Sequence, residues 1–169
     1  MGYVWNMRLF IAIRLSDEVR KALLSCMRDM KRQGVRGNYV PAENLHLTLA
    51  FIGEYDDPAR VKKAIESIPG PKFSLKLSEC GNFGNLLWAG VEENRELNAY
   101  VKELRGALRA SGVPFDSKKF VPHITLVRKA ARKPGGTHLP KAEMRVTRAS
   151  LMKSEIKNGK VVYEEYAGE

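Results

Sequence analysis

Two copies of one tetrapeptide decide how this chain folds: His46–Leu49 is HLTL, and His123–Leu126 is HITL. Each copy lies in an apolar, β-favouring run, Leu45 to Ile52 for the first and Val121 to Val127 for the second. Alternate residues of a strand face the same side of a sheet. We therefore expect each strand to present one imidazole and one hydroxyl on one face and to bury its apolar residues on the other.

The bulk composition is that of an ordinary globular protein with a strong basic excess. The chain has 169 residues, of which 44% are hydrophobic and 28% are charged, and its formal net charge is +10. Such an excess attracts polyanions, chiefly nucleic acid; a generic solubility surface is the alternative explanation. From the length we expect residues 1–169 to form a single domain of two intertwined lobes that share a core.

The cysteines and the N-terminus favour a cytoplasmic location. Cys26 and Cys80 lie in unrelated contexts without a C-x-x-C pair, so we expect two reduced, buried thiols. No apolar run approaches the length of a membrane span, and residues 1–6 lack a charged n-region and a cleavage signal. We interpret these six residues as a short extension. Since no heptad pattern is present, we expect a monomer without membrane contact.

Local signals predict the elements along the chain. Strands are expected at Arg8–Ile13, Tyr39–Val40, Leu45–Ile52, Phe73–Leu77, Leu86–Val91, Phe120–Arg128, Glu143–Ile156 and Lys160–Tyr166. Helices are expected from a cap at Ser16 or Asp17 to about Gln33, from the cap Asp57 and the first helical residue Pro58 to before Pro69, and from Asn94 to Ala110. Asn158-Gly159 predicts a tight hairpin turn. Gly81–Asn85 is expected to be a turn or loop, and residues 129–141 a mobile loop.

The order of these elements is repeated in the two halves of the chain. Each half has a helix before its His-x-Thr strand, and the two histidines are separated by close to half the chain length. We therefore expect an α+β fold duplicated about a pseudo-twofold axis. Two antiparallel-rich sheets would face a central cleft, with the helices outside. This arrangement brings both imidazoles to one cleft.

Two imidazoles at one cleft suit acid–base cleavage of a phosphodiester. A neutral imidazole can take a proton from an attacking water, while a protonated one gives a proton to the leaving oxygen. An unperturbed pKa of about 6.5 allows both forms near neutral pH. In-line attack places the nucleophile and the leaving group on opposite sides of phosphorus. The hydroxyls of Thr48 and Thr125 can donate hydrogen bonds to non-bridging oxygens.

Plainer explanations exist for each feature. A lone histidine on a strand is usually structural, and a lone threonine reflects β propensity, but the duplicated frame outweighs both. Two histidines without cysteine or carboxylate ligands at suitable spacing are a poor metal site, so we expect no metal and no cofactor. For Phe120 and Phe83, stacking on a base and packing in the core are both open. His138 lacks the frame and is expected in a solvated loop.

Four segments together resemble a known superfamily. They are Met7–Ile13, Pro41–Glu54, Leu87–Val91 and Phe120–Leu126. The chain resembles the 2H phosphoesterase superfamily and, within it, the bacterial and archaeal RNA 2′,3′-cyclic phosphodiesterases, also called 2′-5′ RNA ligases. A single His-x-Thr motif is weak, whereas two copies in these contexts are highly specific. The loop at 82–85 is shorter and less basic than the corresponding segment of that family.

The resemblance implies a bilobal 2H phosphoesterase fold and a metal-free reaction. RNA 2′,3′-cyclic phosphate ends would be hydrolysed to 2′-phosphates, and the reverse chemistry would join such an end to a 5′-hydroxyl. It also implies that His46 is the acid for the 3′ leaving oxygen, that His123 is the base for water, and that Arg128 contacts phosphate or base. The implied partners are RNA with 2′,3′-cyclic phosphate ends, such as tRNA-derived ends, or cyclic nucleotides.

Two other functions stay open on the sequence. One is a non-catalytic module that binds RNA ends or nucleotides, which the basic charge permits. The other is a phosphodiesterase for a small cyclic nucleotide such as ADP-ribose 1″,2″-cyclic phosphate. A binding module would not turn over a cyclic phosphate, whereas an enzyme would. A phosphodiesterase for small nucleotides would turn over such a compound in preference to an RNA oligomer.

Overall fold

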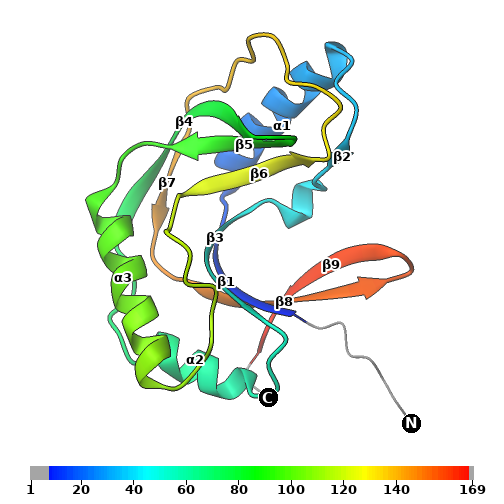
Figure 1. The fold of residues 1–169 in the computed structure, drawn as a ribbon. Coiled ribbons are helices and arrows are strands. Elements are labelled where there is room, and N and C mark those ends of the chain that lie inside the picture. Colours follow the sequence, from blue (N-terminus) through cyan, green and yellow to red (C-terminus); the bar gives the residue numbers. More distant parts are fainter. Residues whose placement is uncertain (1–7, 168–169) are drawn as a thin grey trace.

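The computed structural model describes residues 8–167, which contain nine strands, three α-helices and one short 3-10 helix (Figure 1). The strands are β1 Arg8–Arg14, β2 Asn38–Tyr39, β3 His46–Gly53, β4 Phe73–Phe83, β5 Leu86–Val91, β6 His123–Arg128, β7 Glu143–Val146, β8 Ser150–Lys157 and β9 Lys160–Glu165. The helices are α1 Asp17–Arg32, α2 Pro58–Glu66 and α3 Arg95–Ala110, and the 3-10 turn is Ala42–Asn44. The expected extension at residues 1–6 lies outside the described residues.

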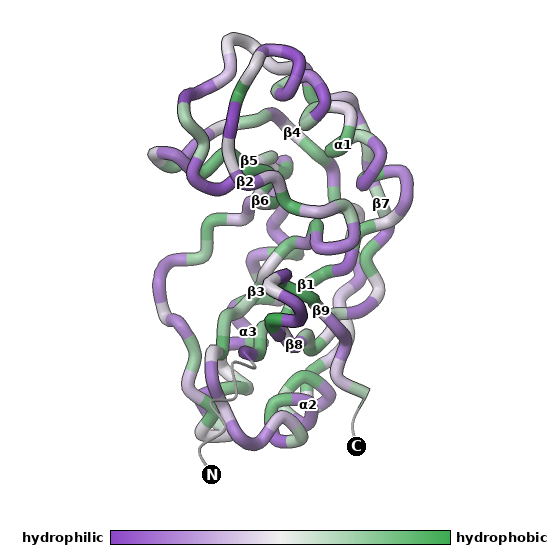
Figure 2. Tube along the Cα trace, turned by 90° about the vertical axis from the view of Figure 1, so that its right-hand side faces the viewer, coloured by the Kyte–Doolittle hydropathy of each residue, from purple (hydrophilic) through white to green (hydrophobic). Residues whose placement is uncertain are grey.

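Two antiparallel sheets form the framework, as the sequence predicted. One has four strands in the order β3-β1-β8-β9, and the other has five in the order β2-β6-β5-β4-β7. The five-stranded sheet and α1, which contacts β7, are called the upper lobe below. The four-stranded sheet is called the lower lobe together with α2 and α3, because these helices contact each other and α3 contacts β3. Figures 1 and 2 show one lobe above the other.

In each half of the chain, one helix follows a strand of one lobe but packs in the other lobe. The first crossing is made by α1, which follows β1 of the lower sheet but packs on the upper one. The second is made by α3, which follows β5 of the upper sheet but packs in the lower lobe. Each His-x-Thr strand then returns to the sheet that the chain left. The two lobes are therefore intertwined, and each sheet receives one histidine strand.

The helices begin where the capping signals predict. Ser16 Oγ accepts a hydrogen bond from the backbone N–H of Val19 at the start of α1. Asp57 caps α2, whose first residue is the proline that already has a fixed helical φ. Asn94 caps α3 in the same way. These signals are local, which is why they could be recognised without tertiary information.

One continuous hydrophobic cluster fills the interior of both lobes. The apolar residues of the two tetrapeptides, Leu47, Leu49, Ile124 and Leu126, are fully buried in it. The burial of β3 and β6 alternates accordingly, with the histidines and threonines only partly buried. Burying such side chains contributes about 1.5–3 kcal/mol each. The core thus fixes the register of β3 and β6 and leaves their histidines and threonines on the opposite face.

The segment 81–85 differs from its expectation as a turn or loop. Strand β4 continues to Phe83, and only Gly84-Asn85 form the turn to β5. Gly81 lies within this strand, and the indole ring of Trp88 packs directly over it. A Cβ at this position would come within 2.3 Å of the ring, so only glycine fits. The glycine therefore marks a close approach of an aromatic ring and not a turn.

The expected long strand at Glu143–Ile156 is wrong as a single element. It is two strands, and β7 pairs with β4 of the upper sheet while β8 pairs with β1 of the lower sheet. The crossover at 147–149 contains no glycine or proline that would have signalled a break. By contrast, the Asn158-Gly159 turn of the β8–β9 hairpin is confirmed, with φ values of 52° and 76°.

The sequence places the two cysteines in unrelated contexts, but the fold brings them together. The Sγ atoms of Cys26 and Cys80 lie 2.9 Å apart, with Cys26 buried and Cys80 partly exposed.

Residues 129–141 are irregular, but their backbone is tied to the upper lobe: the N–H groups of Ala130 and Ala131 donate hydrogen bonds to the carbonyl oxygens of Asn85 and Arg36. No helix within the described residues is long and apolar enough to cross a membrane.

Candidate active site

Strands β3 and β6 meet where the two lobes face each other, and they line a common cavity of about 50 Å³. Its lining residues are Val40, Asn44, His46, Thr48, His123, Thr125, Arg128 and Tyr163. The structure therefore brings together five of the six residues that the sequence singled out. The sixth, Phe120, packs against the hydrophobic core and is not among the described residues that line this cavity.

His46 is held on several sides. Its Nδ1 lies 2.7 Å from the carbonyl oxygen of Asn44, and its Nε2 lies 2.8 Å from Thr48 Oγ1. A carbonyl can only accept, so Nδ1 carries the proton and the Nε2 of the neutral ring faces the hydroxyl. The rings of Phe10 and Tyr163 flank the imidazole at centroid distances of 4.8 and 5.2 Å. These contacts fix both the orientation and the tautomer of the ring.

The surroundings of His46 also favour its neutral form. Burial lowers the pKa of His46 below its ordinary value, and the positive charge of Arg128 and the neighbouring His123 act in the same direction. The hydrogen bond to Asn44 opposes this effect in part. In the protein without substrate, the uncharged imidazole therefore predominates at neutral pH.

His123 repeats the local geometry of His46 with fewer contacts. Its Nδ1 lies 2.8 Å from the carbonyl oxygen of Val121, again the residue two positions earlier in the chain. The Phe83 ring stands nearly perpendicular to the imidazole at 5.2 Å. Among residues 8–167, no side chain or backbone group is hydrogen-bonded to the Nε2 of His123. This nitrogen is therefore available to a bound water or substrate.

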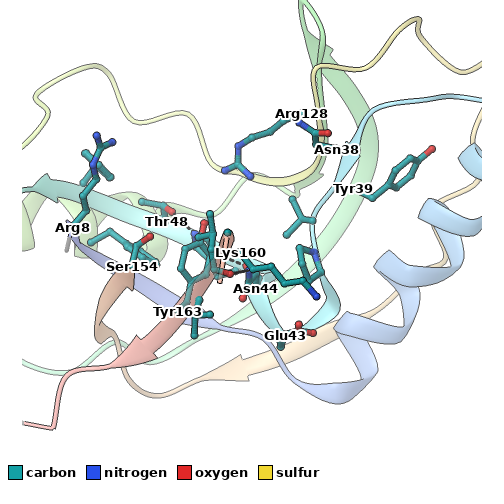
Figure 3. Close-up of a pocket in the computed structure, with 18 residues that line it drawn as sticks. Arg8, Asn38, Tyr39, Glu43, Asn44, Thr48, Arg128, Ser154, Lys160 and Tyr163 are labelled. Atoms are coloured by element: carbon teal, nitrogen blue, oxygen red, sulfur yellow. Dashed lines mark hydrogen bonds between the residues drawn. The ribbon is translucent and has the colours of Figure 1, made fainter. Parts of the chain in front are cut away.

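Arg128 supplies the positive charge of the site. It is the last residue of β6, is exposed, and lines both the small cavity and a larger groove beside it. Figure 3 shows its side chain extending from the upper lobe toward the groove, across from Thr48 of the lower lobe. The part of the chain that the structure describes offers its guanidinium no hydrogen-bond partner, and such a group beside two hydroxyls is a suitable receptor for a phosphate anion.

The larger groove continues from the histidines along the lower lobe. It has a volume of about 950 Å³ and shares His46, Thr48 and Arg128 with the small cavity. Its other walls come from β1, from residues 38–44 and from the β8–β9 hairpin, and they include Arg8, Lys160, Tyr39, Phe10 and Tyr163 (Figure 3). Cations and aromatic rings are the groups that single-stranded nucleic acids contact most.

Several residues of the site were not singled out from the sequence. Phe10 and Tyr163 touch His46 from β1 and β9, and Asn44 is a buried polar residue whose side-chain amide donates to the carbonyl of Val161 at 3.1 Å. The alternation of β1 could have indicated that Phe10 faces away from Ile11 and Ile13. No sequence signal indicates that β9 would reach the first histidine.

Phe83 forms an aromatic pair with Trp88, with centroids 5.1 Å apart, and also contacts His123. Phe83 is 46% exposed, so the structure places this ring at the surface beside His123 and not in the core. The indole Nε1 of Trp88 is buried and has no hydrogen-bond partner among the described residues.

The third histidine, His138, is exposed, as expected for a loop residue. The described residues contain no group of three or more His, Cys, Asp or Glu that could hold a metal.

Two sheets that each present a His-x-Thr strand to one cavity are the architecture of the two-histidine phosphoesterases. A model of the 2′-5′ RNA ligase superfamily matches residues 14–158 of this chain. The RNA 2′,3′-cyclic phosphodiesterase of Thermotoga maritima is 35% identical over 132 residues, which cover 72% of this chain and 70% of that protein. The Escherichia coli protein of the same name is 36% identical over 131 residues, or 73% of each chain.

Solved structures agree with these sequence relationships. The apo structure of Escherichia coli LigT superposes with a TM-score of 0.80 and 29% identity, over 96% of this chain and 95% of that one. The structure of LigT complexed with 3′-AMP gives a TM-score of 0.77 and 31% identity over the same fractions. This chain belongs to the 2′-5′ RNA ligase superfamily.

Proposed function

We propose that this protein is an RNA 2′,3′-cyclic phosphodiesterase that opens terminal cyclic phosphates to 2′-phosphates. The observation that carries the proposal is the convergence of two His-x-Thr pairs and Arg128 on one cavity between the lobes. Two relatives at 35% and 36% identity have this activity in their names. LigT, with the same fold, has been crystallised in complex with 3′-AMP, which supports a nucleotide as the kind of ligand that this chain binds.

The geometry supports a division of roles between the residues. Thr48, Thr125 and Arg128 would donate hydrogen bonds to the non-bridging oxygens of the cyclic phosphate. The Nε2 of His123, which has no partner among the described residues, would take a proton from water as its oxygen attacks phosphorus. His46 would give the proton of its charged form to the 3′ oxygen as the bond from phosphorus to that oxygen breaks. The phosphate then stays on the 2′ oxygen.

The lowered pKa of His46 is compatible with the role of acid. A phosphate anion bound beside the ring adds a negative charge that favours the imidazolium form. The substrate itself would therefore help to charge the acid that it needs. Once charged, an imidazolium whose pKa is held down by burial and by Arg128 releases its proton readily.

The volume of the groove favours an RNA chain over a small cyclic nucleotide. A cavity of about 50 Å³ holds little more than the phosphate, whereas the adjoining groove of about 950 Å³ can take several nucleotides. We expect an RNA oligomer with a cyclic end to have a higher kcat/KM than a 2′,3′-cyclic mononucleotide or ADP-ribose 1″,2″-cyclic phosphate. A preference for either small compound would favour that alternative substrate.

The proposal is tested with an RNA oligomer that ends in a 2′,3′-cyclic phosphate, in the presence of EDTA. The expected product is the 2′-phosphate, and His46→Ala or His123→Ala should each lower kcat/KM by about 10²-fold or more. His138→Ala is the matched control, because this third histidine is exposed in the 129–141 segment. Tight RNA binding without turnover would show a binding module instead, and full activity of either active-site variant would overturn the assignment.

A further inference from the structure

A second pair of chemically reactive side chains lies away from the cavity, between α1 and β4. Cys26 and Cys80 are 54 residues apart in the sequence, yet their Sγ atoms are 2.9 Å apart. We propose that these cysteines form a dithiol site that a small-molecule disulfide, such as glutathione disulfide, oxidises to an intramolecular disulfide bond. The site is independent of the proposed phosphodiesterase function.

The positions of the two sulfurs are close to those of a bonded pair. A disulfide has an S–S distance of about 2.05 Å, so closure needs a relative movement of roughly 0.9 Å. The pairing of β4 with β5 is irregular between Leu77 and Cys80. Such a bulge interrupts the ladder and lets the strand bend. The backbone next to Cys80 can therefore accommodate the shift without unfolding of the sheet.

The two thiols differ in exposure and in acidity. Cys26 has no exposed surface, whereas Cys80 is partly exposed. The hydrogen bond from Cys26 lowers the pKa of Cys80, while the contact with Cys80 and burial raise the pKa of Cys26. Thiolates, and not thiols, attack disulfides. Cys80 is therefore the thiol that reacts first, and Cys26 is the one that completes the bond.

The exchange consists of two displacements. The Cys80 thiolate attacks one sulfur of glutathione disulfide, which forms a mixed disulfide and releases one glutathione thiolate. The Cys26 sulfur, on losing its proton to solvent, then attacks Sγ of Cys80 and releases the second glutathione. In sum the protein dithiol loses two electrons and two protons, and one glutathione disulfide becomes two molecules of glutathione.

The bond would form on the face of the upper sheet opposite to the cavity. Cys80 pairs with Ala89, which pairs with Ile124 in the core, whereas the neighbouring Trp88 pairs with Thr125 of the site. The disulfide would thus fasten α1 to the sheet that carries His123 without touching the residues that line the cavity. Because it closes a long loop of the unfolded chain, we expect it to raise the Tm by about 5 °C or more.

The experiment starts from the full chain, reduced and freed of reductant, and adds glutathione disulfide. The expected product has lost the mass of two hydrogen atoms, has no titratable thiol after denaturation, and contains a Cys26–Cys80 peptide pair on proteolysis without reductant. Its Tm is higher than that of the reduced protein. Dithiothreitol should restore both thiols and the original Tm.

Two single variants test whether Cys80 reacts first and Cys26 second. Cys26→Ala should stop at the mixed disulfide, with one glutathione attached to Cys80, and Cys80→Ala should remain largely unmodified. Cys26→Ser serves the same purpose if the alanine variant folds poorly. The proposal is overturned if wild-type protein ends as a stable glutathione adduct of Cys80. It is also overturned if both thiols stay free under conditions in which the urea-unfolded chain is oxidised.

Discussion

The two His-x-Thr strands offer a comparison of one sequence frame in two environments. In both, the histidine Nδ1 donates to the carbonyl two residues earlier, at 2.7 Å for His46 and 2.8 Å for His123. Part of the difference comes from other parts of the chain. Phe10 and Tyr163 flank the first imidazole, and Thr48 of the same tetrapeptide contacts its Nε2, whereas Phe83 stands beside the second. Tertiary neighbours thus give one duplicated motif two different environments.

The largest expected effect concerns both histidines together. If His46 and His123 act in one proton-transfer sequence, each alanine variant loses about 10²-fold or more, and the double variant loses little beyond the worse single one. The measurement is kcat/KM for a 2′,3′-cyclic RNA end in all four proteins. If the two losses multiply in the double variant, the histidines contribute independently. That result would contradict a single proton-transfer sequence shared by the two strands.

The next prediction assigns the two roles by their pH dependence. The pKa of His46 lies below the ordinary value of 6.5. In His123→Ala, kcat/KM should fall as pH rises through the pKa of His46, because the acid loses its proton. A His46 that acted as the base would instead give a rate that increases over the same interval. The rate of the wild-type enzyme should show both limbs of a bell.

Most of the fold could be predicted because its signals are local. The helix caps at Ser16, Asp57 and Asn94 and the Asn158-Gly159 turn are encoded by neighbouring residues. The candidate site could be predicted because the tetrapeptide occurs twice and its apolar residues alternate with polar ones. The strand break at 147–149 could not, because it is caused by pairing with two different sheets.

The details of the site depend on contacts between distant segments. Tyr163 reaches His46 only because β9 pairs with β8 beside β1, and Cys26 meets Cys80 only because α1 packs on the upper sheet. No periodicity or spacing encodes either contact. A pattern of sequence predicts which face a side chain occupies, but the neighbour on that face is set by the topology of the whole chain.

A smaller effect is expected at the threonines. Thr48→Val and Thr125→Val keep the shape of the side chain and remove a donor to the phosphate, so each should lower kcat/KM by about tenfold or more. Only Thr48 also contacts a histidine nitrogen, at 2.8 Å from His46 Nε2. The pH dependence of the rate should therefore change in Thr48→Val and not in Thr125→Val. Equal changes in both profiles would contradict the difference between the two environments.

The smallest effect on rate, with the clearest effect on structure, is expected at Asn44. Its buried amide ties the start of β3 to Val161 of the β8–β9 hairpin, which carries Tyr163 against His46. Asn44→Ala removes this partly buried hydrogen bond, which costs about 0.5–1.5 kcal/mol and lowers the Tm by roughly 1–6 °C. Asn82→Ala is the control, since that amide is exposed and bonds Gly84 nearby.

The same substitution should reveal what encloses His46. Once the hairpin is no longer held to residue 44, water reaches the imidazole, and the pKa of His46, measured by NMR titration, should rise toward its ordinary value. The backbone carbonyl of Asn44 is still present in the variant, so the tautomer should persist. A lowered Tm with an unchanged pKa would mean that Phe10 and Arg128 suffice to hold the ring neutral. The difference between the two half-sites would then lie in β1 and β6 rather than in the hairpin.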